Sequence, residues 1–196
     1  MSHYYYFAAT LPTLQQGAAA PMTSAEFLER AARYMSGREL EAIRAAALSS
    51  PPEGAPAACL GLSPLLDGYY AWERALRASL ARARAARLGR PAPTLPADAA
   101  ASSAAGLAEA QARAAAQAAS PLEGELLVER ARWEAIESFL GYDQFRFEAV
   151  AAYRLRLLSL ERESSLTAER GEEGYRATYA AILGAANTID LTGDLR

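Results

Sequence analysis

Few residues in this sequence could perform acid–base or nucleophilic chemistry. His3 is the only histidine and lies in the terminal segment, and Cys59 is the only cysteine. A Ser-His-Asp or Cys-His catalytic arrangement needs a histidine base beside its nucleophile, and an internal disulfide needs two cysteines. We therefore expect no catalytic residues and no internal disulfide.

Motifs for metals and cofactors are missing as well. The helical Glu-x-x-His pattern of carboxylate-bridged metal centres does not occur, and one histidine with one cysteine makes a poor zinc site. All twenty basic residues are arginine, so the lysine-containing phosphate loop cannot form, and there is no Gly-x-Gly-x-x-Gly segment. The sequence predicts no metal site and no cofactor.

Glu129 is a carboxylate on a stripe that a helix would bury, because it shares that stripe with Leu126 and Trp133. A buried carboxylate is more often paired with an arginine than catalytic. The alternative is an enzyme with a deep pocket in which carboxylates such as Glu129 and Glu134 converge without arginine partners.

Arginines are concentrated between residues 73 and 90, where six of them accompany one acid. Guanidinium groups suit the carboxylates of a protein partner. One interpretation is therefore a partner-binding face made of Arg74, Arg77, Arg84 and Arg87. The alternatives are a solvated helix surface, or attraction within the fold to residues 120–173, which hold twelve acids and seven arginines.

The composition predicts a globular protein without nucleic-acid binding. Of 196 residues 52% are apolar, which suffices for a helical core, and the net charge of -3 with a pI near 5.4 lacks the positive excess that phosphates attract. No run approaches the roughly 20 apolar residues of a membrane span, and the first residues do not resemble an export signal. We expect a cytoplasmic protein that contacts membranes only through partner subunits.

The elements expected in the first half are one extended segment and three helices. Aromatic and β-branched residues from 3 to 14 favour an extended segment. Thr23 with Glu26, and Ser36 with Glu39, have the spacing of capping boxes, which predicts helices over 24–34 and from 36 to 48. A long helix over 64–88 follows, with an apolar stripe formed by Tyr69, Trp72, Leu76, Leu80 and Ala83.

In the second half, residues 91–119 are expected to form an alanine- and proline-rich linker with an exposed helix near its end. Strong helical patterns resume at Pro121, where Leu122, Leu126, Trp133, Ile136 and Leu140 share a face. Another helix has a seam at Val150, Tyr153, Leu157 and Leu160, and a last helix has Tyr175, Tyr179, Ile182 and Leu183.

These patterns predict an all-α protein. We expect an elongated bundle of about five to six antiparallel helices, with long helical hairpins and a short extended N-terminal segment. Residues 1–90 and 120–196 should pack together as one domain, with 91–119 connecting them.

Several segments resemble a family of uncharacterised bacterial proteins that are encoded among the subunits of V-type (vacuolar/archaeal-type) ATPases. The resemblance is carried by HYYYFAATLPTLQQG and MTSAEFLERAARYMSGRELEAI at the start. YYAWERALRASLARARAARLG, SPLEGELLVERARWEAIESFL and FEAVAAYRLRLLSLERE follow in the same order.

Members of that family are similar in pattern to the socket subunit of the rotary ATPase, designated C, or d in eukaryotes. That subunit is all-helical and lies between the central stalk and the membrane rotor ring. The resemblance implies a non-catalytic component of an ATP-driven ion pump, whose partners are stalk and rotor-ring subunits. The alternative is a stand-alone helical adaptor or assembly factor.

Overall fold

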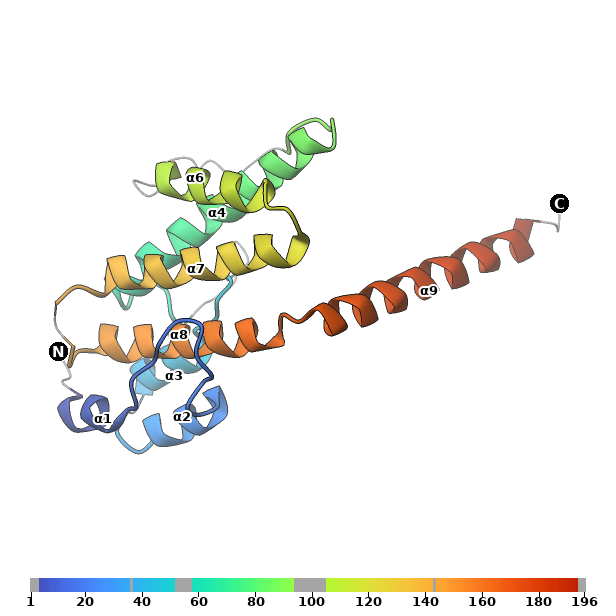
Figure 1. Ribbon diagram of the computed structural model, residues 1–196. Helices are drawn as coiled ribbons and strands as arrows, with labels where there is room; N and C mark the ends of the chain where they lie inside the picture. Colours follow the sequence, from blue (N-terminus) through green and yellow to red (C-terminus); the bar gives the residue numbers. More distant parts are fainter. Residues whose placement is uncertain (1–3, 36, 52–57, 94–104, 143, 194–196) are drawn as a thin grey trace.

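The computed structural model describes residues 4–35, 37–51, 58–93, 105–142 and 144–193, except for the side chains of 105 and 185–193. Within these residues every regular element is a helix, which confirms the all-α prediction (Figure 1). The helices are α1 (Tyr5–Thr10), α2 (Ser24–Ala31), α3 (Gly37–Ala45), α4 (Pro64–Arg87), α6 (Ala105–Ala116), α7 (Pro121–Leu140), α8 (Phe147–Ser165) and α9 (Ala168–Gly193).

Helices α1–α8 pack together, and we call them the body. Helix α4 lies at its centre, in contact with α6, α7 and α8. Tyr69, Trp72, Leu76 and Leu80 on its predicted stripe are buried, and Ala83 is half-buried. Pro64 begins the helix at a position where its missing N–H is not needed. Gly89 follows the helix with φ 63°, a left-handed conformation that glycine adopts without strain. The long helix predicted over 64–88 is therefore confirmed.

The N-terminal segment is helical, not extended, so that prediction is wrong for residues 5–10. Phe7 on α1 is buried, and its ring lies 5.8 Å from that of Phe27 and 5.2 Å from that of Tyr34. The backbone N–H of Tyr4 donates to the carbonyl of Phe145 at 2.7 Å. These tertiary contacts outweigh the strand propensity of the aromatic residues.

Helix α2 begins with the predicted capping box. The Glu26 N–H donates to Thr23 Oγ1 at 3.2 Å, and the Thr23 N–H donates to the Glu26 carboxylate at 2.8 Å. The helix ends at Ala31, earlier than expected, and continues as turns to Tyr34. Ser36, the second predicted cap, lies outside the described residues.

Helix α6 is packed on the body, which corrects the prediction of an exposed helix. Ala108 and Ala112 are fully buried, and the indole N–H of Trp72 on α4 donates to Gln111 Oε1 at 3.2 Å. Alanine side chains allow two helix backbones to approach closely, so α6 is buried without large apolar residues. Residues 94–104 of the predicted linker lie outside the described part of the chain.

Helices α7 and α8 lie side by side, and the chain reverses its direction between them, after Gly141 (Figure 1). On α8, Val150, Leu157 and Leu160 are buried and Tyr153 is half-buried, which confirms the predicted seam. On α7, Leu126 is 38% exposed, so the prediction that it shares a buried face is wrong. The buried face of α7 instead includes Glu129 and Arg132.

Helix α9 projects from the body, so residues 120–196 do not all pack on the N-terminal part as predicted (Figure 1). Every described side chain from 168 to 184 is exposed. We call α9 the arm. None of the helices in the described part of the chain combines the length and the apolarity that crossing a bilayer requires.

Candidate interaction surfaces

The predicted arginine face lies along α4, and its side chains have hydrogen-bond partners within the fold. Arg77 Nε lies 2.5 Å from Glu73 Oε1, and Arg84 Nη2 lies 3.3 Å from Glu125 Oε1 on α7. Arg74 contacts Ser50 Oγ at 3.0 Å, and Arg87 contacts the carbonyl of Ala116 at 2.9 Å. Of these contacts only the one between Arg84 and Glu125 reaches residues 120–173, and binding of a partner by the four arginines stays a prediction.

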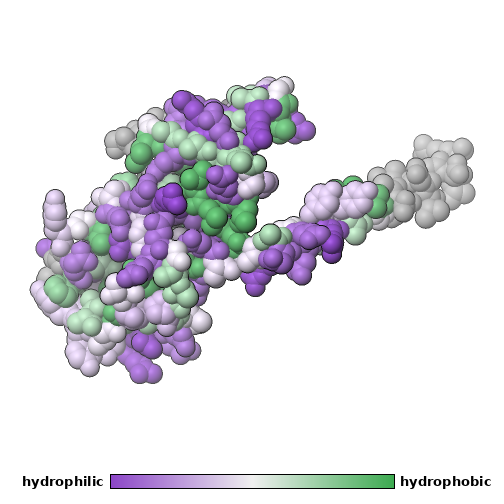
Figure 2. Space-filling view, in the orientation of Figure 1, coloured by the Kyte–Doolittle hydropathy of each residue, from purple (hydrophilic) through white to green (hydrophobic). Residues whose placement is uncertain are grey.

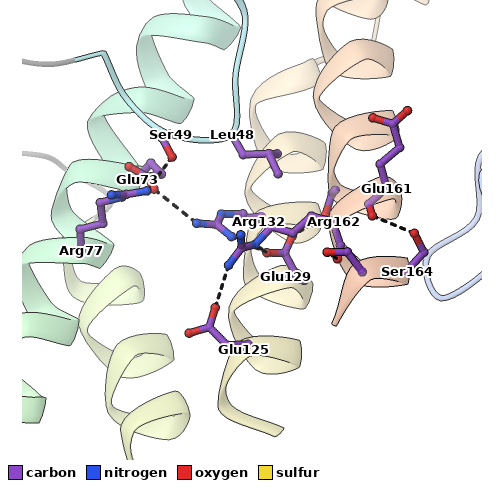
Figure 3. A network of polar contacts seen from close by, with 12 residues as sticks. Leu48, Ser49, Glu73, Arg77, Glu125, Glu129, Arg132, Glu161, Arg162 and Ser164 are labelled. Atoms are coloured by element: carbon purple, nitrogen blue, oxygen red, sulfur yellow. Dashed lines mark hydrogen bonds and ion pairs between the residues drawn. The ribbon is translucent and has the colours of Figure 1, made fainter. Parts of the chain in front are cut away.

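A buried network of charges connects α4, α7 and α8 (Figure 3). Arg132 on α7 donates to Glu129, and its Nη2 lies 3.5 Å from Glu73 Oε1 on α4. On α8, Arg162 Nε lies 2.7 Å from Glu129 Oε1, and Ser159 Oγ donates to Glu129 Oε2 at 2.9 Å. Glu73 and Glu129 are at most 1% exposed.

Arg132 balances the two buried carboxylates of this network. Burial by itself lowers the pKa of Arg132, but its electrostatic interactions with the Glu129 carboxylate, the Tyr69 hydroxyl and the Glu73 carboxylate outweigh burial and raise that pKa above its ordinary value. The guanidinium therefore stays charged, as two buried carboxylates require.

The expectation that Glu129 pairs with arginine is confirmed by its contacts with Arg132 and Arg162. Glu134 is exposed and accepts a hydrogen bond from Gln111 at 3.3 Å, on another face of α7. The two carboxylates therefore do not converge as the enzyme alternative requires. The described residues contain no group of three or more potential metal ligands, Cys59 is fully buried, and His3 lies outside them.

An exposed aromatic cluster lies at the end of the body away from the arm, on α1, after α2 and in the turn between α7 and α8 (Figure 1). We call it the aromatic cap; it consists of Tyr5, Tyr6, Tyr34 and Phe145. The rings of Tyr5 and Phe145 lie 4.6 Å apart, and those of Tyr6 and Tyr34 lie 5.7 Å apart. A hollow of about 180 Å³, lined in part by Leu11, Leu140 and Phe145, adjoins it.

The arm carries the second apolar surface. Its arm stripe is formed by Tyr175, Tyr179, Ile182 and Leu183, of which even the least exposed, Leu183, has an exposed fraction of 47%. The Tyr175 and Tyr179 rings stack with centroids 6.1 Å apart. In Figure 2 polar residues cover the first half of the arm, and apolar residues reach its surface farther out.

Sequence reasoning placed the residues of the arm stripe on one face of the last helix, but it did not single out the residues of the aromatic cap. The signal for the cap was the run of tyrosines at 4–6, and the signal for the arm stripe was its spacing of four and three residues. Spacing identifies an apolar face without saying whether its partner lies in the same chain.

Comparisons with known proteins add no relative. No protein-family model matches the chain, and neither a curated protein nor a solved structure matches it.

Proposed function

We propose that this protein is a non-catalytic component of a V-type ATPase that resembles the socket subunit and couples the central stalk to the membrane rotor ring. In this proposal it is an antiparallel helical bundle that lies in the cytoplasm, peripheral to the membrane, and reaches the membrane only through partner subunits. It uses no cofactor of its own. The resemblance of its segments to proteins encoded with these ATPases supports the choice of assembly.

The observation that carries the proposal is the exposed arm stripe. Four large apolar side chains project into solvent from a helix whose described side chains are all exposed. Contiguous exposed apolar surface of this kind is typical of a binding site, and aromatic residues are enriched among the side chains that dominate binding energy. A partner would therefore gain the most binding free energy by covering the arm stripe.

The spacing of the stripe selects the kind of partner. Tyr175, Tyr179 and Ile182 are separated by four and three residues, the spacing with which two helices pack along a shared seam. The occupant that fits is a helical segment of a stalk subunit, which would lie along α9 and cover these three side chains.

The aromatic cap provides a second contact at the far end of the body. A component that couples two parts of a machine needs two separated attachment surfaces, and tyrosine rings combine a large contact area with a hydroxyl that tolerates water. In this proposal one partner holds the arm and the other covers the cap.

The test is co-purification of the intact ATPase from cells that express a tagged copy of this chain. We expect the wild-type chain to remain in stoichiometric amount. The double variant Tyr179→Ser/Ile182→Ser should be retained at least about tenfold less, because each truncated side chain removes apolar burial of about 1.5 kcal/mol or more. Leu88→Ser/Leu107→Ser, two exposed leucines on the body, is the matched control and should bind normally.

Two results would reject the proposal. Retention of the arm variant at the wild-type level would show that the arm is not the attachment surface. Association with ATPase subunits during assembly, followed by absence from the mature enzyme, would establish the alternative function of an adaptor or assembly factor.

A further inference from the structure

The arm is joined to the body by a connection of two residues, Leu166 and Thr167. Thr167 Oγ1 accepts a hydrogen bond from the Arg170 N–H at 3.3 Å, and the Thr167 carbonyl accepts one from the Gly171 N–H at 3.0 Å. Helix α9 is therefore capped and formed directly after the connection. With so short a link, the direction of the arm depends on how firmly the last turn of α8 is held.

Polar contacts brace that turn from two sides. Toward α7, Arg162 Nε lies 2.7 Å from Glu129 Oε1 and its Nη2 lies 3.0 Å from Glu125 Oε2. Toward α2, Glu161 Oε1 accepts a hydrogen bond from the Ser24 N–H at 2.5 Å. Glu161 and Arg162 therefore point to different neighbours, and Figure 3 shows both beside the network.

Arg162 is the better anchored of the two braces, because it grips two carboxylates. Its side chain is 43% exposed, but Glu129 is 1% exposed and is held in turn by Arg132, which reaches Glu73 on α4. A charge-assisted contact to a buried acceptor is stronger than one at the surface. The last turn of α8 is thereby connected through side chains to the central helix of the body.

We propose that Arg162 is a positioning residue that sets the direction of the arm relative to the body. This inference rests on the proposed function, since a lever that transmits torque must not pivot where it leaves the body. Loss of the Arg162 contacts would leave the apolar seam of α8 packed but free its last turn, and the arm would then swing about Leu166 and Thr167.

The test is pulsed electron–electron double resonance, which measures distances between two spin labels, on the isolated full chain in a Cys59→Ala background. One pair, Ala177→Cys with Ala81→Cys, reports the arm relative to α4. A second pair, Arg130→Cys with Ala81→Cys, reports two helices inside the body. All three labelled positions are exposed helix sites.

In Arg162→Gln we expect the arm-to-body distance distribution to be about twofold broader, because a two-residue hinge then becomes the main restraint. The distribution within the body should keep its width. Glu125→Gln should broaden the arm distribution less, since Arg162 keeps Glu129. Arg84→Gln is the matched control: it removes the contact between Glu125 and α4 but none with α8, so the arm distribution should be unchanged.

Unchanged width in Arg162→Gln would overturn the inference, and so would equal broadening of both pairs, which would mean general loss of structure. Arg162→Lys should give an intermediate width, because an ammonium cannot grip both carboxylates as a guanidinium does. These measurements use the chain alone, so they succeed or fail independently of whether ATPase subunits bind the arm.

Discussion

Replacing Arg132 with methionine tests whether the buried network stabilises the body. Arg132 has a side chain that is 7% exposed and contacts two carboxylates, Glu73 and Glu129, which are buried still more completely. Methionine fills a similar volume but leaves both negative charges without the guanidinium between them. The free energy of unfolding should therefore fall.

The size of the loss follows from what each carboxylate keeps. Removing one partner of a buried ion pair typically costs about 3–5 kcal/mol. Glu73 keeps Arg77 at 2.5 Å, and Glu129 keeps Arg162 at 2.7 Å and Ser159 at 2.9 Å. These contacts offset part of the cost, so we expect a loss of about 2–3 kcal/mol. For a chain of this size that lowers the melting temperature by about 4–12 °C.

The assay is urea denaturation followed by far-ultraviolet circular dichroism, at low and high salt. Arg130→Met is the control, because Arg130 is an exposed neighbour on α7, and it should change stability by less than about 0.5 kcal/mol. The deficit of Arg132→Met should persist at high salt, since buried charges are screened weakly. Equal stability of the two variants would refute the reasoning.

Two further changes probe the packing and the tyrosines. In Gly124→Ala the new Cβ would lie 2.8 Å from the Ala115 carbonyl oxygen, so α6 and α7 must separate, and urea denaturation should show a loss of about 1–3 kcal/mol; Gly174→Ala meets no atom within 4 Å and should show no loss. Burial raises the pKa of Tyr153 from 10.0 to about 12, so the unfolded chain releases this proton first. The stability that Tyr153 contributes is complete below pH 10.0 and lost as the pH rises toward about 12, and the urea midpoint of Tyr153→Phe should fall less over that range.

Local signals in the sequence predict some elements well. Helix α4 combines a proline at its start, a glycine at its end and a continuous apolar stripe, and all three agree with one another. The Thr23–Glu26 capping box is equally local, because its donors and acceptors lie within one helical turn. Such features depend little on the rest of the chain.

The misplaced elements depend on contacts between distant residues. Helix α1 forms because Phe7 packs on Phe27 and Tyr34, and nothing in residues 3–14 predicts those contacts. Helix α6 packs on the body through the buried side chain of Ala108, but alanine occurs on exposed helix faces as readily as on buried ones. Alanine periodicity is a weak signal because each residue buries little area.

For the buried charge network, the sequence predicts that a carboxylate pairs with arginine but does not predict which arginines take part. Glu129 could be expected to meet an arginine, but Arg162 comes from another helix, and which residues meet depends on how α7 and α8 are rotated. The arginine face raised the same difficulty. Its contact with Glu73 is an i,i+4 pair within α4, but its contacts with Ser50, Glu125 and Ala116 are set by packing that sequence periodicity does not contain.

The isolation of α9 divides the chain into two regimes of local stability. Most of the stability of a helix in a protein comes from packing of an apolar face, and the arm's described side chains add no such burial. Its amide hydrogens should therefore exchange with solvent far faster than those of α4 or α8, and substitutions in it should leave unfolding of the body unchanged. Selection for a stable fold then hardly acts on the arm, whose sequence can change without loss of stability in the body.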